Sequence, residues 1–298
     1  MQAYYGEFAS LLVAIFWTIT ALAFERASLR IGSLSLNVIR LLIGFTFLSV
    51  FVWISRGTPF PGDASSFNWF WLAISGLIGF VFGDLFLFKA FTLIGSRFSM
   101  LIMTLAPPIA AISGWILLGE KLTLLNITGM LLTMTGISLA IFVRPGDKNG
   151  SSLKVSWKGL LYAFFGAAGQ GVGLVISKYG MQDYDPFAAT QIRLIAAIVG
   201  FFILTTWLGR WNKVLAATRN RKGMTAAGIG SFFGPFLGVS FSLLAIKYTE
   251  TGIAATIMAI VPILIIPPAI LIYKEKVKLL EIIGSLISIA GVSLLFLS

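Results

Sequence analysis

The sequence predicts an all-α integral membrane protein with ten transmembrane helices, built as two five-helix repeats of inverted topology. Three observations predict this fold. Hydrophobic residues make up 58% of the 298 residues and charged residues only 11%, a composition far outside the range of soluble domains. Long apolar runs cover nearly the whole chain, and its two halves resemble each other in sequence.

Ten apolar runs are expected to be helices, because a helix crosses ~30 Å of hydrocarbon with roughly 20 apolar residues and lipid offers no other partner for backbone polar groups. They cover residues 8–25, 34–54, 69–91, 98–118, 124–143, 157–177, 187–208, 224–246, 253–273 and 279–297. The first run ends in a motif resembling a signal-peptidase site, but Glu7 stands where a basic segment should precede it. We therefore expect this helix to be retained.

An internal repeat divides the chain. At an offset of 153, residues 6–40 align without gaps on residues 159–193, and Arg40 matches Arg193. At an offset of 155, nine residues recur: Gly79, Gly83, Ala90, Met103, Pro107, Glu120, Lys121, Gly129 and Gly136 match Gly234, Gly238, Ala245, Met258, Pro262, Glu275, Lys276, Gly284 and Gly291. We predict a first repeat over 1–143, a polar linker over 144–156 and a second repeat over 157–298. Because five is odd, the second repeat enters the membrane from the opposite side.

The positive charges predict the orientation. Fifteen Lys and Arg residues lie in the links after helices one, three, five, seven and nine, and four lie in the other links. Both termini are then expected outside the cytoplasm of a multi-pass protein in a bacterial-type inner (plasma) membrane. The net charge of +11 becomes a cytoplasmic collar facing anionic lipid, so we expect no nucleic-acid partner.

The two halves resemble a known pattern. The segment "AFTLIGSRFSMLIMTLAPPIAAISGWILLGEKLTLLNITGMLLTMTGISL" (90–139) and its echo at 245–294 resemble the EamA type of the drug/metabolite transporter superfamily. That pattern includes an Arg in the second helix of each half, here Arg40 and Arg193, and a Trp in the first, here Trp17. The resemblance implies a ten-helix secondary transporter. Two features depart from it: Gln170 stands where the second half would repeat Trp17, and the family usually keeps its termini in the cytoplasm.

The resemblance implies alternating access around a midplane cavity, and the residues themselves suggest several candidate substrate contacts. Proline kinks a helix, so Met103 with Pro107 and Met258 with Pro262 are candidate gate and cavity residues, or plain structural kinks. An indole and an amide could stack on and hydrogen-bond a small solute. Trp17 and Gln170 are therefore candidate contacts, or only packing and a bridge between helices.

Asp84 is the candidate binding and coupling residue, because it is the only carboxylate well inside an apolar run and its repeat mate is Val239. A charge at helix centre costs at least ~2.5 kcal/mol unless it is paired or faces water. Asp84 could bind a substrate ammonium or exchange protons. Alternatively it pairs with a nearby cation such as Lys89, although a spacing of five residues is poor for a helix.

Two repeated sets are expected to be structural. Arg40 and Arg193 are expected to form a buried ion pair or to snorkel outward, with attraction of an anionic substrate as the alternative. Glu120 and Lys121, and their mates Glu275 and Lys276, are expected to cap the helix that follows them and to form a loop ion pair. The alternative is that the two Glu residues latch alternating conformations.

The expected function is secondary transport of a small organic metabolite, an amino acid or a similar compound, moved outward and coupled to protons. A lipid or lipid-linked-sugar flippase and multidrug efflux are the alternatives. With no Cys and no His, the chain offers no thiol or imidazole chemistry and no cluster of nucleophile, base and metal ligands. We expect no enzyme activity, no cofactor and no metal. Substrate, membrane lipid and protons are the expected partners, in a monomer or homodimer.

Overall fold

The computed structural model describes residues 4–142, 156–264, 267 and 279–296. It is 88% helical, with no strand in those ranges. Six helices in them are long and apolar enough to cross a membrane: α1 (Tyr5–Ile31), α2 (Ser33–Arg56), Ser66–Ile94, α7 (Trp157–Met181), α8 (Pro186–Trp207) and Arg221–Tyr248. The prediction of an all-helical integral membrane protein is confirmed in this coarser form.

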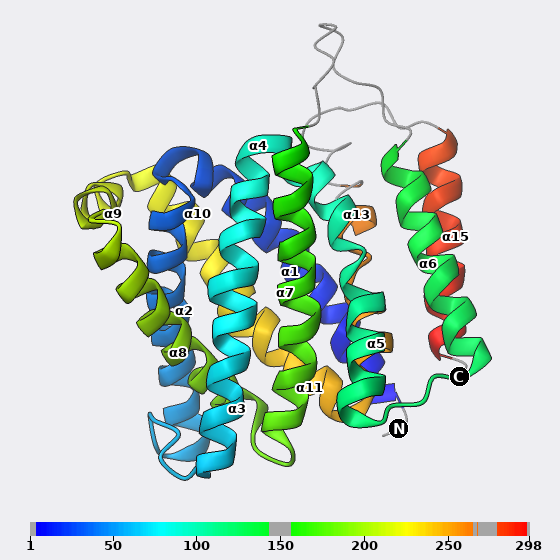
Figure 1. Cartoon of the computed structure of the whole chain (residues 1–298), viewed down its shortest axis with the longest axis horizontal. Coiled ribbons are helices and arrows are strands. Elements are labelled where there is room, and N and C mark those ends of the chain that lie inside the picture. Colours follow the sequence, from blue (N-terminus) through cyan, green and yellow to red (C-terminus); the bar gives the residue numbers. More distant parts are fainter. Residues whose placement is uncertain (1–3, 143–155, 265–266, 268–278, 297–298) are drawn as a thin grey trace, which may run out of the picture.

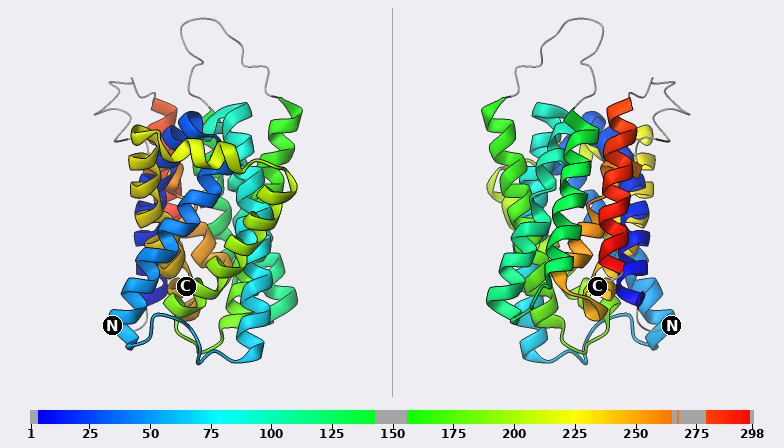
Figure 2. Two further views of the ribbon diagram at one scale, coloured as in Figure 1. Left: turned by 90° about the vertical axis from the view of Figure 1, so that its left-hand side faces the viewer. Right: turned by 90° about the vertical axis from the view of Figure 1, so that its right-hand side faces the viewer.

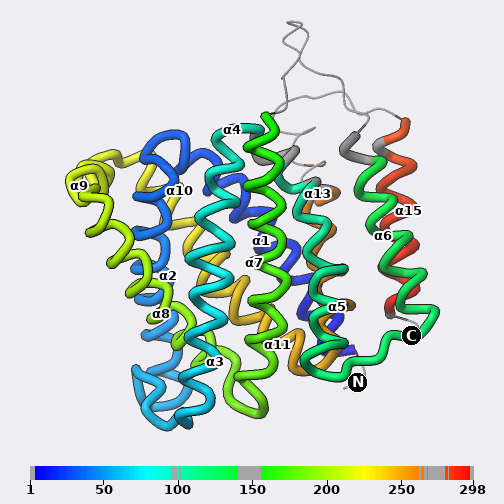
Figure 3. The backbone as a smooth tube through the Cα atoms, in the orientation of Figure 1, coloured from blue at the N-terminus to red at the C-terminus, as the bar shows by residue number. Residues whose placement is uncertain are grey.

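Shorter helices complete the bundle. They are α5 (Ala106–Leu118), α6 (Leu124–Phe142), α12 (Thr251–Met258), α13 (Val261–Leu264) and α15 (Leu279–Phe296). A further short helix, α9 (Trp211–Thr218), lies at the end of the bundle opposite to the start of α1 (Figure 3). Arg219 lies in its link to α10, and Arg221 and Lys222 begin that helix, so this segment is basic and suits a position against an anionic surface.

Two of the long helices contain a π-helical segment. The first runs through α3 (Ser66–Gly76), η2 (Leu77–Gly83) and α4 (Asp84–Met103), and the second through α10 (Arg221–Ser231), η3 (Phe232–Gly238) and α11 (Val239–Tyr248). The π segments begin 155 residues apart, at Leu77 and Phe232. Segments of this kind are rare and occur often at functional sites.

The predicted link between residues 91 and 98 is wrong, because α4 remains helical from Asp84 to Met103. The chain breaks later, at Thr104 and Leu105, just before Pro107 and Pro108 at the start of α5. Proline has no amide hydrogen and restricts the residue before it, so the prolines set the break.

Helices α6 and α15 form a pair at one edge of the bundle (Figures 1 and 2). Glycines bring their backbones together: a Cβ on Gly129 would lie 3.0 Å from the carbonyl oxygen of Gly291, and a Cβ on Gly136 would lie 2.6 Å from that of Gly284. Close approach over small residues is how helices associate in lipid. The pair runs in opposite directions (Figure 1).

The two π segments pack on α7 and α1 in the middle of the bundle. A Cβ on Gly169 of α7 would lie 2.7 Å from the Cα atom of Gly83, and a Cβ on Gly173 would lie 3.0 Å from that of Gly79. On the other side, a Cβ on Gly238 would lie 2.7 Å from the Nε1 atom of Trp17. These glycines let α1 and α7 lie close to the π segments and so shape the space between them.

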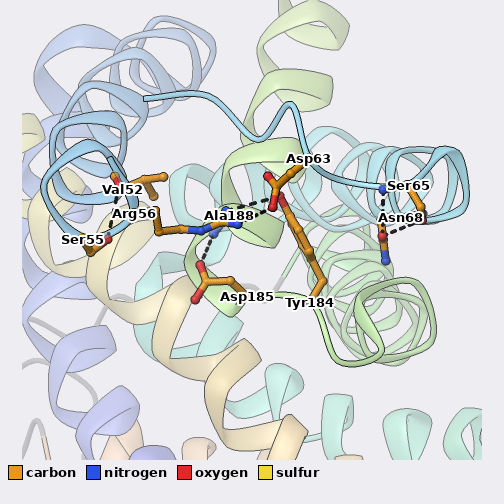
Figure 4. A network of polar contacts seen from close by, with 9 residues as sticks. All are labelled: Val52, Ser55, Arg56, Asp63, Ser65, Asn68, Tyr184, Asp185 and Ala188. Atoms are coloured by element: carbon orange, nitrogen blue, oxygen red, sulfur yellow. Dashed lines mark hydrogen bonds and ion pairs between the residues drawn. The ribbon is translucent and has the colours of Figure 1, made fainter. Parts of the chain in front are cut away.

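A polar cluster joins the two halves at the end of the bundle where α1 begins (Figure 4). Arg56 pairs with Asp63 at 2.5 Å and donates to the hydroxyl of Tyr184, which donates to Asp63 at 2.9 Å. This bond from Tyr184 is the main reason that the pKa of Asp63 lies below its usual value, while burial raises the pKa of Tyr184. The cluster ties the loop before α3 to the link between α7 and α8.

Candidate functional site

A cavity of about 160 Å³ lies between the helices of the two halves. Its walls come from α1, α2, η2, α4, α5, α7, α8, η3, α11, α12 and α13, and they are mainly apolar and aromatic. A mainly apolar cavity with a few convergent polar groups is the usual form of a small-molecule site. Six of the predicted site residues line it: Trp17, Asp84, Met103, Pro107, Gln170 and Met258. Pro262 lies in α13.

Both breaks in helical structure border this cavity. Thr104 and Pro107 flank the break between α4 and α5, and Ala259 and Val261 flank the one between α12 and α13. Irregular backbone at membrane depth is tolerated where it lines a cavity. Broken helices thus bring backbone and side chains from both halves to one place.

The polar wall of the cavity is centred on Asp84, at the first position of α4. One carboxylate oxygen forms an ion pair with the Nη2 atom of Arg40, and the other accepts from the Nε2 atom of Gln170 at 2.5 Å. Arg40 also donates from Nε to Asn37 at 3.0 Å. The side chains of Arg40 and Asp84 are only 4% and 7% exposed. The four side chains form a hydrogen-bonded unit across α2, α4 and α7.

Two expectations about these charges are wrong. Lys89 is exposed and does not pair with Asp84, since a spacing of five residues turns it to another face of α4. Arg40 and Arg193 do not snorkel, because they are 3% and 4% exposed and lie inside the bundle. A buried ion pair of Arg40, the other expectation, is present, and its partner is Asp84.

Phe80 lies between the two arginines. Its ring centroid is 5.8 Å from the Cζ atom of Arg40 and 4.9 Å from that of Arg193. Phe88 and Phe24 lie 4.8 and 5.6 Å from the Cζ atom of Arg40. Contacts of this geometry stabilise a cation inside an apolar site. No pattern in the sequence points to Phe80 or to Asn37, because phenylalanine is common in this chain and Asn37 lies near a helix start.

Glu120 lies outside the cavity and holds two halves of the chain together. Its carboxylate accepts from the Nζ atom of Lys178 and the hydroxyl of Thr251, both at 2.7 Å, and from the backbone amide of Thr251 at 3.0 Å. Lys178 also donates to the carbonyl of Thr249. Glu120 therefore caps α12, from the second half, and pairs with α7.

The predicted cap of the following helix by Glu120 is wrong. Thr123 and Asn126 cap α6 instead, with the Thr123 hydroxyl accepting from the Asn126 amide at 3.1 Å and the Asn126 side chain accepting from the Thr123 amide at 2.8 Å. A hydroxyl one residue before a helix satisfies its free amides at shorter range. Lys121 is exposed, and the ion pair of Glu120 is with Lys178. Glu275 and Lys276 lie outside the described residues.

Among the described residues, no group of three or more acidic, His or Cys side chains is placed to hold a metal ion. The charged and amide side chains that line the cavity, within the described ranges, are those of Arg40, Asp84, Gln170 and Arg193.

Comparison with known proteins gives a consistent set of relatives. The model of the EamA-like transporter family matches the chain twice, over residues 4–142 and 157–297. A protein of Clostridium kluyveri described as an uncharacterized transporter is 29% identical over 139 residues, which span 46% of this chain and 42% of that protein. A solved structure described as "Crystal structure of protein" has the same fold, with a TM-score of 0.71 at 17% identity over 97% of this chain and 95% of that one.

Proposed function

Since this chain belongs to the EamA-like transporter family of the drug/metabolite transporter superfamily, we propose that it is a secondary transporter that moves a small organic metabolite by alternating access. It is a membrane transporter and not an enzyme. The cargo is an amino acid or a similar compound, and the direction is export. The observation that carries the proposal is the cavity, because groups from both halves converge there and its walls include both helix breaks.

Ten helices in two inverted repeats are part of the proposal. The π segments begin 155 residues apart, and so do the two helix breaks, at residues 104 and 259. The contacts of α6 with α15 are reciprocal: the same offset turns the contact of Gly129 with Gly291 into that of Gly284 with Gly136. A self-complementary contact is the mark of two-fold symmetry, and an in-plane two-fold axis suits alternating access.

Glu120 is the proposed latch at one end of the cavity. Its carboxylate joins the end of α5 to Lys178 of α7 and to Thr251 of α12. The loop between α2 and α3, which carries Asp63, lies at the same end of the bundle (Figure 1). Opening this end requires both sets of bonds to break. By the distribution of basic residues this is the outer end of a plasma-membrane protein, so both termini are proposed to lie outside.

Coupling to protons is proposed at Asp84, the carboxylate of the cavity wall. A proton there would break the ion pair with Arg40 and free that guanidinium, so the charge of the cavity would change as the proton arrives. Under an imposed pH gradient, Asp84→Asn is expected to remove the gradient's effect on transport. Transport by this variant that responds to the gradient as the wild type does would exclude Asp84 as the proton site.

The test of the function is counterflow in proteoliposomes with radiolabelled amino acids, amines, sugars and nucleotides. Saturable exchange of one class is expected. Exchange of none of these solutes, together with movement of a fluorescent phospholipid between leaflets, would favour the flippase instead and contradict the proposal.

A further inference from the structure

The second arginine of the cavity, Arg193, is a buried cation without a hydrogen-bonding partner at its Nε atom. Arg193 is 4% exposed and lines the cavity. In the described ranges no carboxylate lies within ion-pair distance of it, and its close neighbours are the ring of Phe80 and the backbone of Gly79. A buried charge that lacks a partner is unfavourable, so an anion bound beside Arg193 would stabilise it.

The internal repeat shows which partners are missing. Arg40, the repeat mate of Arg193, has two partners: its Nε atom donates to Asn37, and its Nη2 atom pairs with Asp84. A guanidinium carries N–H donors on Nε and on both Nη atoms, so more than one partner is required to satisfy it. Arg40 is therefore a satisfied structural cation.

Neither partner is repeated in the second half. The position that matches Asn37 is Thr190 (37 + 153), whose hydroxyl donates to the carbonyl of Pro186 in its own helix. The position that matches Asp84 is Val239 (84 + 155), an apolar residue that lines the cavity. Arg193 thus keeps the charge of Arg40 and lacks both of its hydrogen-bonding partners, and Asp84, which pairs with Arg40, attracts Arg193 only from beyond ion-pair distance.

The charge of the cavity leads to the same conclusion. The charged residues that line it, within the described ranges, are Arg40, Asp84 and Arg193, two cations and one anion. The start of α5 cannot supply many anion-binding amides, because Pro107 and Pro108 have no amide hydrogen. The unpaired guanidinium of Arg193 is therefore the group best placed to receive an anion.

We infer that Arg193 binds the carboxylate of the transported substrate, an inference that rests on the proposed function. The fork of a guanidinium matches the two oxygens of a carboxylate, and the neighbouring wall of Met103, Met258 and Phe80 suits an apolar remainder. The substrate class is a small monocarboxylate with an apolar side chain, amino acids included. The substrate carboxylate pairs with Arg193 as Asp84 pairs with Arg40.

The experiment compares matched compounds in wild-type proteoliposomes. Leucine, leucinamide, 4-methylpentanoate and isoamylamine share one side chain, and phenylalanine, phenylalaninamide, 3-phenylpropionate and phenethylamine share another. Inhibition of counterflow is measured for each. The two acids of each set are expected to inhibit at least about tenfold more strongly than the amide and the amine, the fold-change that corresponds to one hydrogen bond to a charged group.

Variants assign the preference to this arginine. Arg193→Gln is expected to reduce the ratio of acid to amide to near one. Val239→Asp places a carboxylate where the repeat puts Asp84, so it is expected to pair with Arg193 and to exclude the acids selectively. Lys89→Gln removes an equal charge from the exposed face of α4 and is expected to keep the wild-type ratio.

Two different results would overturn the inference, and only the second would also refute the proposed function. Saturable counterflow with amides or amines inhibiting as strongly as acids in the wild type would leave the transporter and remove the carboxylate site at Arg193. This comparison needs no variant to fold. Counterflow of no small solute at all would refute the proposed function and this inference with it.

Discussion

The ion pair of Arg40 and Asp84 makes a quantitative prediction about stability. Asp84→Asn keeps the shape of the side chain and removes its charge, so Arg40 would remain as an uncompensated cation in a site where both side chains are less than a tenth exposed. Removing one partner of a buried pair destabilises a protein by about 3–5 kcal/mol. The amide of Gln170 would also lose its charged acceptor. We expect the free energy of unfolding to fall by an amount in that range.

A double-mutant cycle isolates the pair itself. Arg40→Met alone should also destabilise, because it leaves the carboxylate of Asp84 unpaired. The double variant, Arg40→Met with Asp84→Asn, should be more stable than the sum of the two single effects predicts, by about 1–3 kcal/mol. The free energy of unfolding is measured by SDS titration in mixed micelles. Lys89→Gln, an exposed cation of the same helix, is the control and should change stability by less than about 0.5 kcal/mol. Additive effects of Arg40→Met and Asp84→Asn, within about 0.5 kcal/mol, would refute the pairing.

Three further predictions concern the helix contacts and the closed end of the bundle. Glu120→Gln should lower the free energy of unfolding by about 1–3 kcal/mol and increase the rate of exchange transport. Lys121 is exposed, so Lys121→Gln should change neither quantity. Equal effects of the two variants would contradict the role of Glu120 as a latch. Gly169→Ala should destabilise by about 1–3 kcal/mol, because its Cβ would lie 2.7 Å from the backbone of η2, whereas Gly228→Ala has open space and should be neutral or stabilising; the reverse order in SDS titrations would show that the helices are not packed in this way. Asp63 has a lowered pKa, so its contribution to the stability of the fold should be complete above its unfolded pKa of about 3.9 and be lost as the pH falls through the lowered value. In thermal unfolding, the loss of stability caused by Asp63→Asn should be constant at neutral pH and vanish in strong acid. A loss of stability that persists in strong acid would count against the bond between Asp63 and Tyr184.

The sequence was sufficient for the all-helical membrane class and for several residues of the cavity wall. Composition and run length predict membrane helices directly, because lipid allows few other solutions. The search for positions that differ between the halves selected Trp17, Asp84 and Gln170, all of which line the cavity. This worked because packing glycines recur in both halves, whereas a polar group inside lipid is retained for a specific contact.

The partners of these residues could not be predicted from the sequence. Arg40 and Asp84 are 44 positions apart and Glu120 and Thr251 are 131 apart, and no local spacing relates residues on helices that meet only in the folded bundle. Nothing in the sequence distinguishes Lys178 from an ordinary loop cation, because its role depends on the position of Glu120. The sequence predicts the break before α5 too early in the chain, because the apolar content of a segment does not show where within it one helix ends and the next begins.

The direct test of alternating access is the accessibility of the cavity from each side of the membrane. The chain has no Cys, so single cysteines can be labelled with a membrane-impermeant maleimide in right-side-out and inverted vesicles. Met103→Cys, in the cavity wall, should react from both faces, while Asp63→Cys should react only from outside and Thr218→Cys only from inside. Reaction of Met103→Cys from one face alone, or from neither, while both controls react as stated, would contradict transport through this cavity.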